Sequence, residues 1–405
     1  MASRREFLRM GLGSGAALGL AALPGVSFAA PASGDARLVV VILRGALDGL
    51  AVVPPYGDAD YALARGPLAI ARPTEAKGAL DLDGFFGLHP ALPGLHERWR
   101  ARELVVVHAT ASPYRERSHF DGQNVLENGG DRPSGAASGW LNRALGALPP
   151  ARGQGLALGQ NVPLILRGAA PVGSWAPSLL PEVEPELVTR LRDLYSNDTT
   201  LAARLDEATR IGALADEESA VAPGGQQKMA RAGNAARLRA IAETAGRMLA
   251  AADGPRVAVI DAGGWDTHAG EGGADGQLAG RLRGLDDALG ALCAGLGDAW
   301  ARSVVLVCTE FGRTVEVNGT HGTDHGTGAA ALLVGGALAG GRVISDWPGL
   351  APHQRYEGRD LRPTTDLRAV AKGLLAEHLG VPARAFGDVF PGAERIAPLG
   401  GLVRA

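Results

Sequence analysis

The chain has 405 residues, 46% of them hydrophobic and 20% charged, and its 40 basic and 43 acidic side chains leave a formal net charge of −3. No basic stripe runs along the sequence, which argues against nucleic acid as a partner. With only Cys293 and Cys308 present, a metal site built from cysteine ligands is excluded. The length exceeds that of one ordinary core, so we expect one large domain with an insertion, or two lobes.

The N-terminal segment has the features of a targeting signal. An arginine pair at 4–5, followed by a phenylalanine and a further arginine, resembles the twin-arginine export box. The apolar Gly/Ala-rich run at 10–23 is too short to span a bilayer, and residues 27–29 fit a small-x-small cleavage site. We expect a signal peptide over 1–29, recognition by the twin-arginine export machinery, and a periplasmic or otherwise exported mature chain over 30–405. No second run of about 20 apolar residues occurs, so no membrane span is expected in the mature chain.

Apolar, β-branched runs predict the strands of a central sheet. The expected strands are 38–43, 104–108, 256–261, 303–308, 329–334 and 342–344. Helical periodicity between several of them, as over 277–301, indicates βαβ units. We therefore predict an α/β fold with a mostly parallel central sheet flanked by helices.

Two stretches interrupt this pattern. Residues 149–181 are rich in Gly and Pro and contain one short apolar piece, 162–166. Residues at about 185–252 are rich in Ala, Leu, Arg and Glu and carry no cluster of catalytic residue types. This composition predicts a helical insertion with a structural role or a role as a lid.

Residues 309–328, TEFGRTVEVNGTHGTDHGTG, hold the densest group of candidate ligands. They follow the apolar run at 303–308, and glycines and threonines among them favour a loop. The side chains of interest are Glu310, Arg313, His321, Asp324 and His325. Carboxylates and imidazoles beyond a buried strand are costly unless they hold a metal, a substrate or one another. The alternative is a solvated loop with chance histidines.

Further polar side chains follow other predicted strands. Asp48 comes after the run at 38–43, at the edge where ligands of open α/β sheets bind, although an Asp that stabilises the turn is an equal alternative. Asp266 and His268 lie in a glycine-rich loop after 256–261. A carboxylate oxygen and a ring nitrogen at this spacing can reach one ion.

Residues 114–121, YRERSHFD, form a second cluster at a predicted helix start. Ser118 is a candidate nucleophile there, because the free amides of a helix start stabilise negative charge. A simple N-cap serine is the alternative. Candidates for holding an anionic group are Arg115 and Arg117, and candidates for a ligand or base are His119 and Asp121.

Five segments together resemble the DUF1501 family of exported bacterial proteins, over nearly all of the mature chain: LRGALDG, RSHFDGQ, GGWDTHAG, TEFGRT and HGTDHG. The name of that family records that its activity is not established. More distantly, the arrangement is similar to the alkaline phosphatase and sulfatase superfamily. The resemblance implies an alkaline phosphatase-like fold, with an acidic ligand after the first strand and a nucleophile at a helix start.

The resemblance also implies roles for individual residues. Asp48 would be the first ligand and Ser118 the nucleophile, with His119 beside it as a catalytic candidate. Two departures from the superfamily pattern stand out: Glu310-Phe311 replaces an Asp-His pair at a strand end, and the Asp266 pair is closely spaced. The expected metal ligands are Asp48, Asp266, His268, Glu310, His321, Asp324 and His325.

The implied activity is metal-assisted hydrolysis of a small anionic phosphate or sulfate ester. One or two divalent ions, zinc by ligand type, would lower the pKa of Ser118 or of a water. Arg313 or Arg44 would bind the equatorial oxygens of the ester. The alternative is an exported binding or scaffold protein that kept the fold and lost the chemistry.

Overall fold

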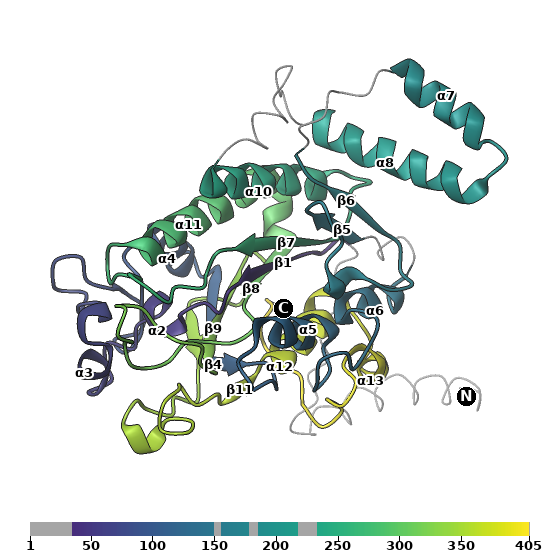
Figure 1. Cartoon of the computed structure of the whole chain (residues 1–405). Helices are drawn as coiled ribbons and strands as arrows, with labels where there is room; N and C mark the ends of the chain where they lie inside the picture. Colours follow the sequence, from purple (N-terminus) through teal and green to yellow (C-terminus); the bar gives the residue numbers. More distant parts are fainter. Residues whose placement is uncertain (1–34, 150–154, 178–184, 218–232, 405) are drawn as a thin grey trace, which may run out of the picture. The chain divides into compact units, whose positions relative to one another are not determined.

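A nine-stranded mixed sheet lies at the centre of the fold (Figure 1). The computed structural model describes residues 35–149, 155–177, 185–217 and 233–404, so the predicted signal peptide lies outside the described residues. Within those residues, no helix is long and apolar enough to cross a membrane.

The strands of the sheet are β1 (Arg37–Arg44), β4 (Leu104–Ala111), β5 (Gly155–Leu158), β6 (Val172–Trp175), β7 (Val257–Gly263), β8 (Ser303–Cys308), β9 (Ala329–Val334), β10 (Arg342–Ile344) and β11 (Thr365–Asp366). Their order is β10-β4-β9-β8-β1-β7-β5-β6, with β11 beside β4. A separate two-stranded sheet pairs β2 (Leu80–Asp81) with β3 (Gly87–Leu88). All six predicted strands are confirmed, whereas β5, β6 and β11 were not predicted.

β9 is antiparallel to its neighbours β4 and β8, and the other pairings in the sheet are parallel. The carboxyl ends of β1, β4, β7 and β8 therefore meet at one edge of the sheet. The amino end of β9 lies at the same edge, because this strand runs the opposite way. The predicted α/β class with a mostly parallel sheet is confirmed.

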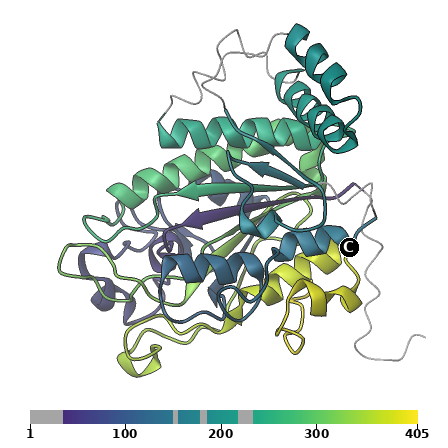
Figure 2. The ribbon, with the colours of Figure 1, turned by 45° about the vertical axis from the view of Figure 1, so that its right-hand side comes forward.

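The helices are α2 (Gly49–Val52), α3 (Tyr61–Arg65), α4 (Pro93–Arg100), α5 (His119–Asn128), α6 (Trp140–Gly146), α7 (Pro185–Tyr195), α8 (Thr199–Glu217), α10 (Asn234–Ala250), α11 (Gln277–Leu296), α12 (Leu367–Leu374) and α13 (Phe386–Val389). They cover both faces of the sheet: α10 and α11 lie on one face, and α5, α6, α12 and α13 on the other (Figure 2).

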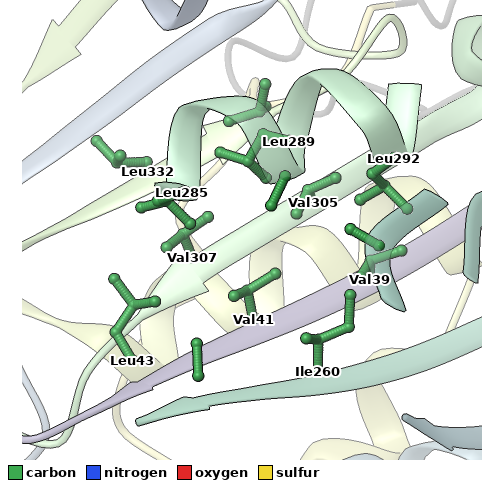
Figure 3. Packing of buried hydrophobic residues seen from close by; sticks show 14 of the residues in the cluster. Val39, Val41, Leu43, Ile260, Leu285, Leu289, Leu292, Val305, Val307 and Leu332 are labelled. Carbon is green, nitrogen blue, oxygen red and sulfur yellow. The ribbon is translucent and has the colours of Figure 1, made fainter. Parts of the chain in front are cut away.

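Successive side chains of β1 point to opposite faces of the sheet, and both sets are apolar, which explains why helices cover both faces. Val39, Val41 and Leu43 pack against α11, where Leu285 and Leu289 meet them (Figure 3). The intervening residues of the same strand face the second core, with α5, α6 and α12. A strand buried on both faces shows the continuous apolar run that the sequence displays here.

The predicted helical insertion at about 185–252 contains α7, α8 and α10, while 218–232 lie outside the described residues. α10 is not a peripheral part of this insertion, because its residues Ala245, Met248 and Leu249 are buried in the same core as the apolar side chains of α11. The last of the three helices thus belongs to the layer that covers the sheet.

Helices α10 and α11 run parallel in close contact. A Cβ added to Gly284 would lie 2.9 Å from the Cβ of Ala235, and one added to Gly295 would lie 3.1 Å from the Cα of Gly246. The two contacts have the same offset along the chain, which requires the helices to run in the same direction. Glycine at these positions allows the backbones to approach.

We predict that Gly246→Ala lowers the free energy of unfolding by about 1–3 kcal/mol, because the new methyl group would lie 2.5 Å from the carbonyl oxygen of Leu292. Gly290→Ala, on the exposed side of α11 with no atom within 4 Å of the added Cβ, is the matched control and should gain up to about 1 kcal/mol. Urea unfolding measures both. Equal stability of the two variants would contradict this account of the contact.

Candidate metal centre

The loops that follow β1, β7 and β8 meet at the carboxyl edge of the sheet. Gly45, with φ +121°, lies so close to the β7 loop that an added Cβ would be 2.5 Å from the backbone nitrogen of Asp266. The N–H of Thr323 donates to the carbonyl of Thr267 at 3.2 Å, which joins the β7 loop to the β8–β9 loop. Segments that are far apart in sequence are thus held together by backbone contacts.

Arg313 is the buried centre of this junction. Its guanidinium is 1% exposed and forms an ion pair with Asp266. Its other acceptors are backbone carbonyls: Ala46 at 2.7 Å, Gly45 at 2.9 Å, Thr323 at 3.0 Å and Trp265 at 3.2 Å. Because these donors are used within the protein, Arg313 holds the loops in place of the substrate contact expected from the sequence.

Three histidines surround the carboxylate of Asp266. The Nε2 atoms of His268 and His325 lie 3.1 and 3.3 Å from its Oδ1, and that of His119 lies 3.4 Å from its Oδ2. The two Nε2 atoms of His268 and His325 are 2.9 Å apart. Ligand atoms of His119, Asp266 and His325 all lie within 4.8 Å of one another. Three potential ligands therefore converge on one point, and His268 lies beside two of them, Asp266 and His325.

The other nitrogen of each ring, Nδ1, lies beside an oxygen acceptor. The pairs are His119 with Glu310 at 2.8 Å, His268 with Asp324 at 3.2 Å, and His325 with the backbone carbonyl of Arg117 at 2.9 Å. An imidazole that donates from Nδ1 keeps its lone pair on Nε2, which is the form that binds a metal. The Nε2 of His119 is buried and has no hydrogen-bond partner among the described residues. The donor set fits a divalent ion.

Glu310 lies behind the histidines as their buried support. Besides His119, its Oε1 accepts from the backbone of Gly45 at 2.9 Å and from Gln123 at 3.1 Å. Burial alone would raise the pKa of Glu310, but these hydrogen bonds, with that from His119 the largest, hold it below the usual value. Phe311 stacks on the His119 ring at a centroid distance of 5.1 Å. Glu310 thus orients a ligand, in place of the direct ligation expected from the sequence.

The charges of the cluster follow from these contacts. Partial burial would raise the pKa of Asp266. The guanidinium of Arg313 lowers this pKa by more than burial raises it, so the carboxylate is ionised at neutral pH. Burial lowers the pKa of His325, with repulsion from a protonated His119 next. The hydrogen bond to Glu310 raises the pKa of His119.

Three of the predicted ligands, besides Glu310, lie outside the cluster. Asp48 is the N-cap of α2: its Oδ1 accepts from the N–H groups of Leu50 and Ala51 at 3.0 and 3.1 Å, and its Oδ2 pairs with Arg65. The turn-stabilising alternative is the one that the structure favours. His321 has φ +59° and an exposed side chain. Asp324 contacts the cluster only through His268, as a support for that ring.

The three arginines predicted to bind substrate have partners within the protein. Arg44 pairs with Glu127 and Asp261, Arg115 donates to the carbonyls of Ser112 and Tyr114, and Arg117 pairs with Glu357 and Asp360. The charges of Arg44 and Arg117 are therefore compensated by carboxylates, whereas the partners of Arg115 are neutral backbone carbonyls.

Ser118 occupies the N-cap position of α5, as the sequence predicts. Its side chain makes no capping hydrogen bond, and its N–H donates to the hydroxyl of Tyr114 at 3.1 Å. A serine that served only as a cap would bond to the first-turn amides. The first turn of α5, which begins with His119, therefore has no side-chain cap.

Sequence reasoning missed a buried charge group beside this site. Arg65 pairs with Asp48 and lies 3.9 Å from Glu271, whose Oε2 accepts from Thr323 at 2.7 Å. Burial, and then the charge of Asp48, raises the pKa of Glu271 to about 8. One cation between two carboxylates favours one protonated acid. The signal available in the sequence was an acidic residue among glycines, three positions after His268.

We predict that Glu271→Gln removes a pH dependence of stability. The folded-state pKa of Glu271 lies above its ordinary value of 4.5, so its stabilising protonated form is complete below about pH 4.5 and is lost as the pH rises through about 8. Wild-type protein should lose more unfolding free energy than the variant between pH 5.5 and 8.5, measured in urea. Identical losses in the two proteins would show that Glu271 is ionised when folded.

The family model "Protein of unknown function (DUF1501)" matches residues 104–388. Among curated proteins there is no match. Solved structures with some similarity include a phosphonate monoester hydrolase of Agrobacterium radiobacter, with TM-score 0.34 and 12% identity, covering 86% of this chain and 74% of that chain.

Two further structures are similar at the same low level. Ps i-CgsB in complex with k-i-k-neocarrahexaose has TM-score 0.34 and 10% identity, covering 77% of this chain and 68% of that chain. The C-terminal periplasmic domain of EcEptC from Escherichia coli, in complex with Zn, has TM-score 0.29 and 10% identity, covering 75% and 76%. Likeness at these scores establishes neither an activity nor a ligand.

Proposed function

We propose that this chain, which belongs to the DUF1501 family, is a metal-dependent hydrolase of phosphate or sulfate esters, exported to the periplasm by the twin-arginine route. The observation that carries the proposal is the orientation of three imidazoles, each with Nδ1 beside an acceptor and Nε2 toward Asp266. Nitrogen ligands with one carboxylate are typical of zinc.

The side chains that would hold the ion are His119, Asp266 and His325, with His268 beside them as a fourth candidate. Ligands at ordinary zinc distances stand roughly 3.3 Å from one another, and the contacts of Asp266 to His119 and His325 measure 3.4 and 3.3 Å. An ion bound there would supply Lewis acidity toward the ester oxygens and lower the pKa of an attacking hydroxyl or water. We propose one ion, because among the described residues this is the single cluster of close ligand atoms.

The supporting residues keep the ligands in one geometry. Arg313 fixes the carboxylate of Asp266 and keeps it ionised. Glu310 fixes the ring of His119 through the hydrogen bond at Nδ1. Supports of this kind raise the affinity for the ion because the ligands do not have to be ordered when it binds.

Ser118 is the proposed nucleophile, next in sequence to the ligand His119. Its hydroxyl is not used in capping, which leaves the first-turn amides of α5 without a side-chain cap. These amides stabilise charge on the ester oxygens. They take the role that the sequence assigned to Arg44, Arg117 and Arg313, whose charges are paired with carboxylates within the protein.

A binding or scaffold protein that holds the ion without turnover is the second candidate. The observation that favours it is the absence, among the described residues, of a hydrogen-bonded base at the Ser118 hydroxyl. A catalytic serine ordinarily has such a base or a metal to activate it. The two candidates share the metal centre and differ in whether esters are hydrolysed.

We predict that the purified protein retains about one zinc ion per chain. His325→Ala and Asp266→Asn should each lose it, because each removes one of the proposed ligands. His321→Ala, which changes a histidine in the same loop outside the cluster, is the matched control and should keep the ion. Elemental analysis by mass spectrometry after mild purification gives the count. A wild-type chain without metal would contradict the proposed centre.

We predict turnover of aryl phosphate or aryl sulfate esters by the zinc-loaded protein. Ser118→Ala should lower kcat by roughly 10³-fold if Ser118 is the nucleophile, whereas Ser196→Ala, on an exposed turn, should leave it unchanged. Release of nitrophenol from a panel of both ester types is the measurement. Unchanged turnover in Ser118→Ala would assign the attack to a water, and no turnover of any ester would favour the binding protein.

A further inference from the structure

A cavity of about 1230 Å³ opens beside the candidate metal centre. Its walls are the carboxyl ends of β5, β6 and β7 and the first turns of α10 and α11. Gly263, Gly264 and Trp265 line it and lead directly into Asp266. Pockets for drug-sized molecules measure about 300–1,000 Å³, so this space exceeds what a phosphate or sulfate group needs.

Two helices begin at this cavity. α11 follows β7 and therefore starts at the carboxyl edge of the sheet, and α10, which runs parallel to it, starts at the same edge (Figure 1). Their N-caps are Gly276 and Gly233, which have no side chain to cap the helix. At the start of α11 the N–H of Leu278 donates to the carbonyl of Glu271 at 3.1 Å. The dipoles of the two helices give this end of the cavity a positive potential.

The charged side chains of the wall add to this potential. Arg237 and Arg281 line the cavity, and within the part of the chain that the structure describes neither forms an ion pair. Asp261 is the acidic residue of the lining, and its partner Arg44, at 2.9 Å, is shared with Glu127. The two arginines of the lining outweigh this one carboxylate. The uncompensated charge of the wall is therefore positive.

Arg281 also lies next to the loop that carries Asp266. Gly264 has φ +96°, and a Cβ added to it would lie 2.4 Å from Nη1 of Arg281. The glycine thus leaves room for this guanidinium two residues before a candidate metal ligand. A cation at this place can contact a molecule that also reaches the metal centre.

The uncharged polar side chains of the cavity lining are suited to binding hydroxyl groups of a ligand. Four amide side chains line the cavity: Gln160, Asn161, Asn234 and Gln277. Trp265 is 97% buried in this wall, and its indole N–H has no hydrogen-bond partner among the described residues. Amides both donate and accept, as hydroxyl groups do, and a buried donor without a partner is costly until a ligand satisfies it.

We infer that this cavity binds the organic part of the substrate, and that this part carries hydroxyl groups and a second negative charge held by Arg237 and Arg281. The inference rests on the proposed function for the ester that reaches the metal centre. It goes further by naming a bulky, polyhydroxylated anion as the group to which that ester is attached.

The test is a comparison of two ligands by isothermal titration calorimetry with the zinc-loaded protein. 6-Phosphogluconate and glucitol 6-phosphate share the phosphate ester and the hydroxylated chain, and differ at the far end, where the first has a carboxylate. We expect the first to bind about tenfold more tightly, as one charge-assisted contact allows.

The double variant Arg237→Gln/Arg281→Gln should reduce this ratio to less than twofold. Arg281→Lys, which keeps the charge, should retain a preference, and Arg283→Gln, on the same helix but outside the lining, should leave the ratio at about tenfold. Circular dichroism melting confirms that each variant is folded.

Equal affinity of wild-type protein for the two ligands, binding of neither, or a preference that survives in the double variant would overturn the inference. The readout is binding and needs no turnover. A carboxylate preference that depends on the two arginines, found in a protein that hydrolyses no ester, would therefore support the cavity while the proposed hydrolase activity fails. Ester turnover without such a preference would support the hydrolase activity and overturn the inference about the cavity.

Discussion

One buried guanidinium determines how the strand-end loops of this protein meet. Arg313 is almost fully enclosed, and a charge in that position is tolerated only where its donors have partners. Its partners are backbone carbonyls of the β1, β7 and β8–β9 loops, together with the carboxylate of Asp266. The contacts that make the burial possible therefore also fix the distance between three loops, and with it the place of Asp266 among the histidines.

The reversed direction of β9 brings the necessary residues to that junction. A parallel strand after β8 would need a crossover to the opposite edge of the sheet. Because β9 is antiparallel to β8, residues 309–328 turn back at the carboxyl edge. One loop thus supplies Glu310, Arg313 and His325 to the same small volume. The arrangement explains why candidate ligands are so dense in this stretch of sequence.

The sequence predicted most strands of the sheet and the segments that meet at its carboxyl edge. It predicted less well what each side chain does there. Apolar runs predicted six strands, whereas β5 and β6 have only four residues each and lie in Gly- and Pro-rich sequence, where periodicity cannot be read. These two strands form part of the cavity wall, so the cavity was beyond prediction. Residue type also does not reveal which atoms face one another. Glu310 supports a ring, whereas His119 presents its Nε2 to the cluster.

The ring contacts impose a further condition on the cluster. The acceptors beside His268 and His325 are a carboxylate and a carbonyl, which cannot donate, so each Nδ1 must carry the proton. Both Nε2 atoms then keep lone pairs, yet they lie 2.9 Å apart and face Asp266. Such an arrangement is repulsive without positive charge between the atoms. A proton on one ring relieves one contact, whereas the proposed divalent ion would satisfy the nitrogens of His119 and His325 and the carboxylate together. The supporting hydrogen bonds are thus suited to the proposed ion as the positive charge of this site.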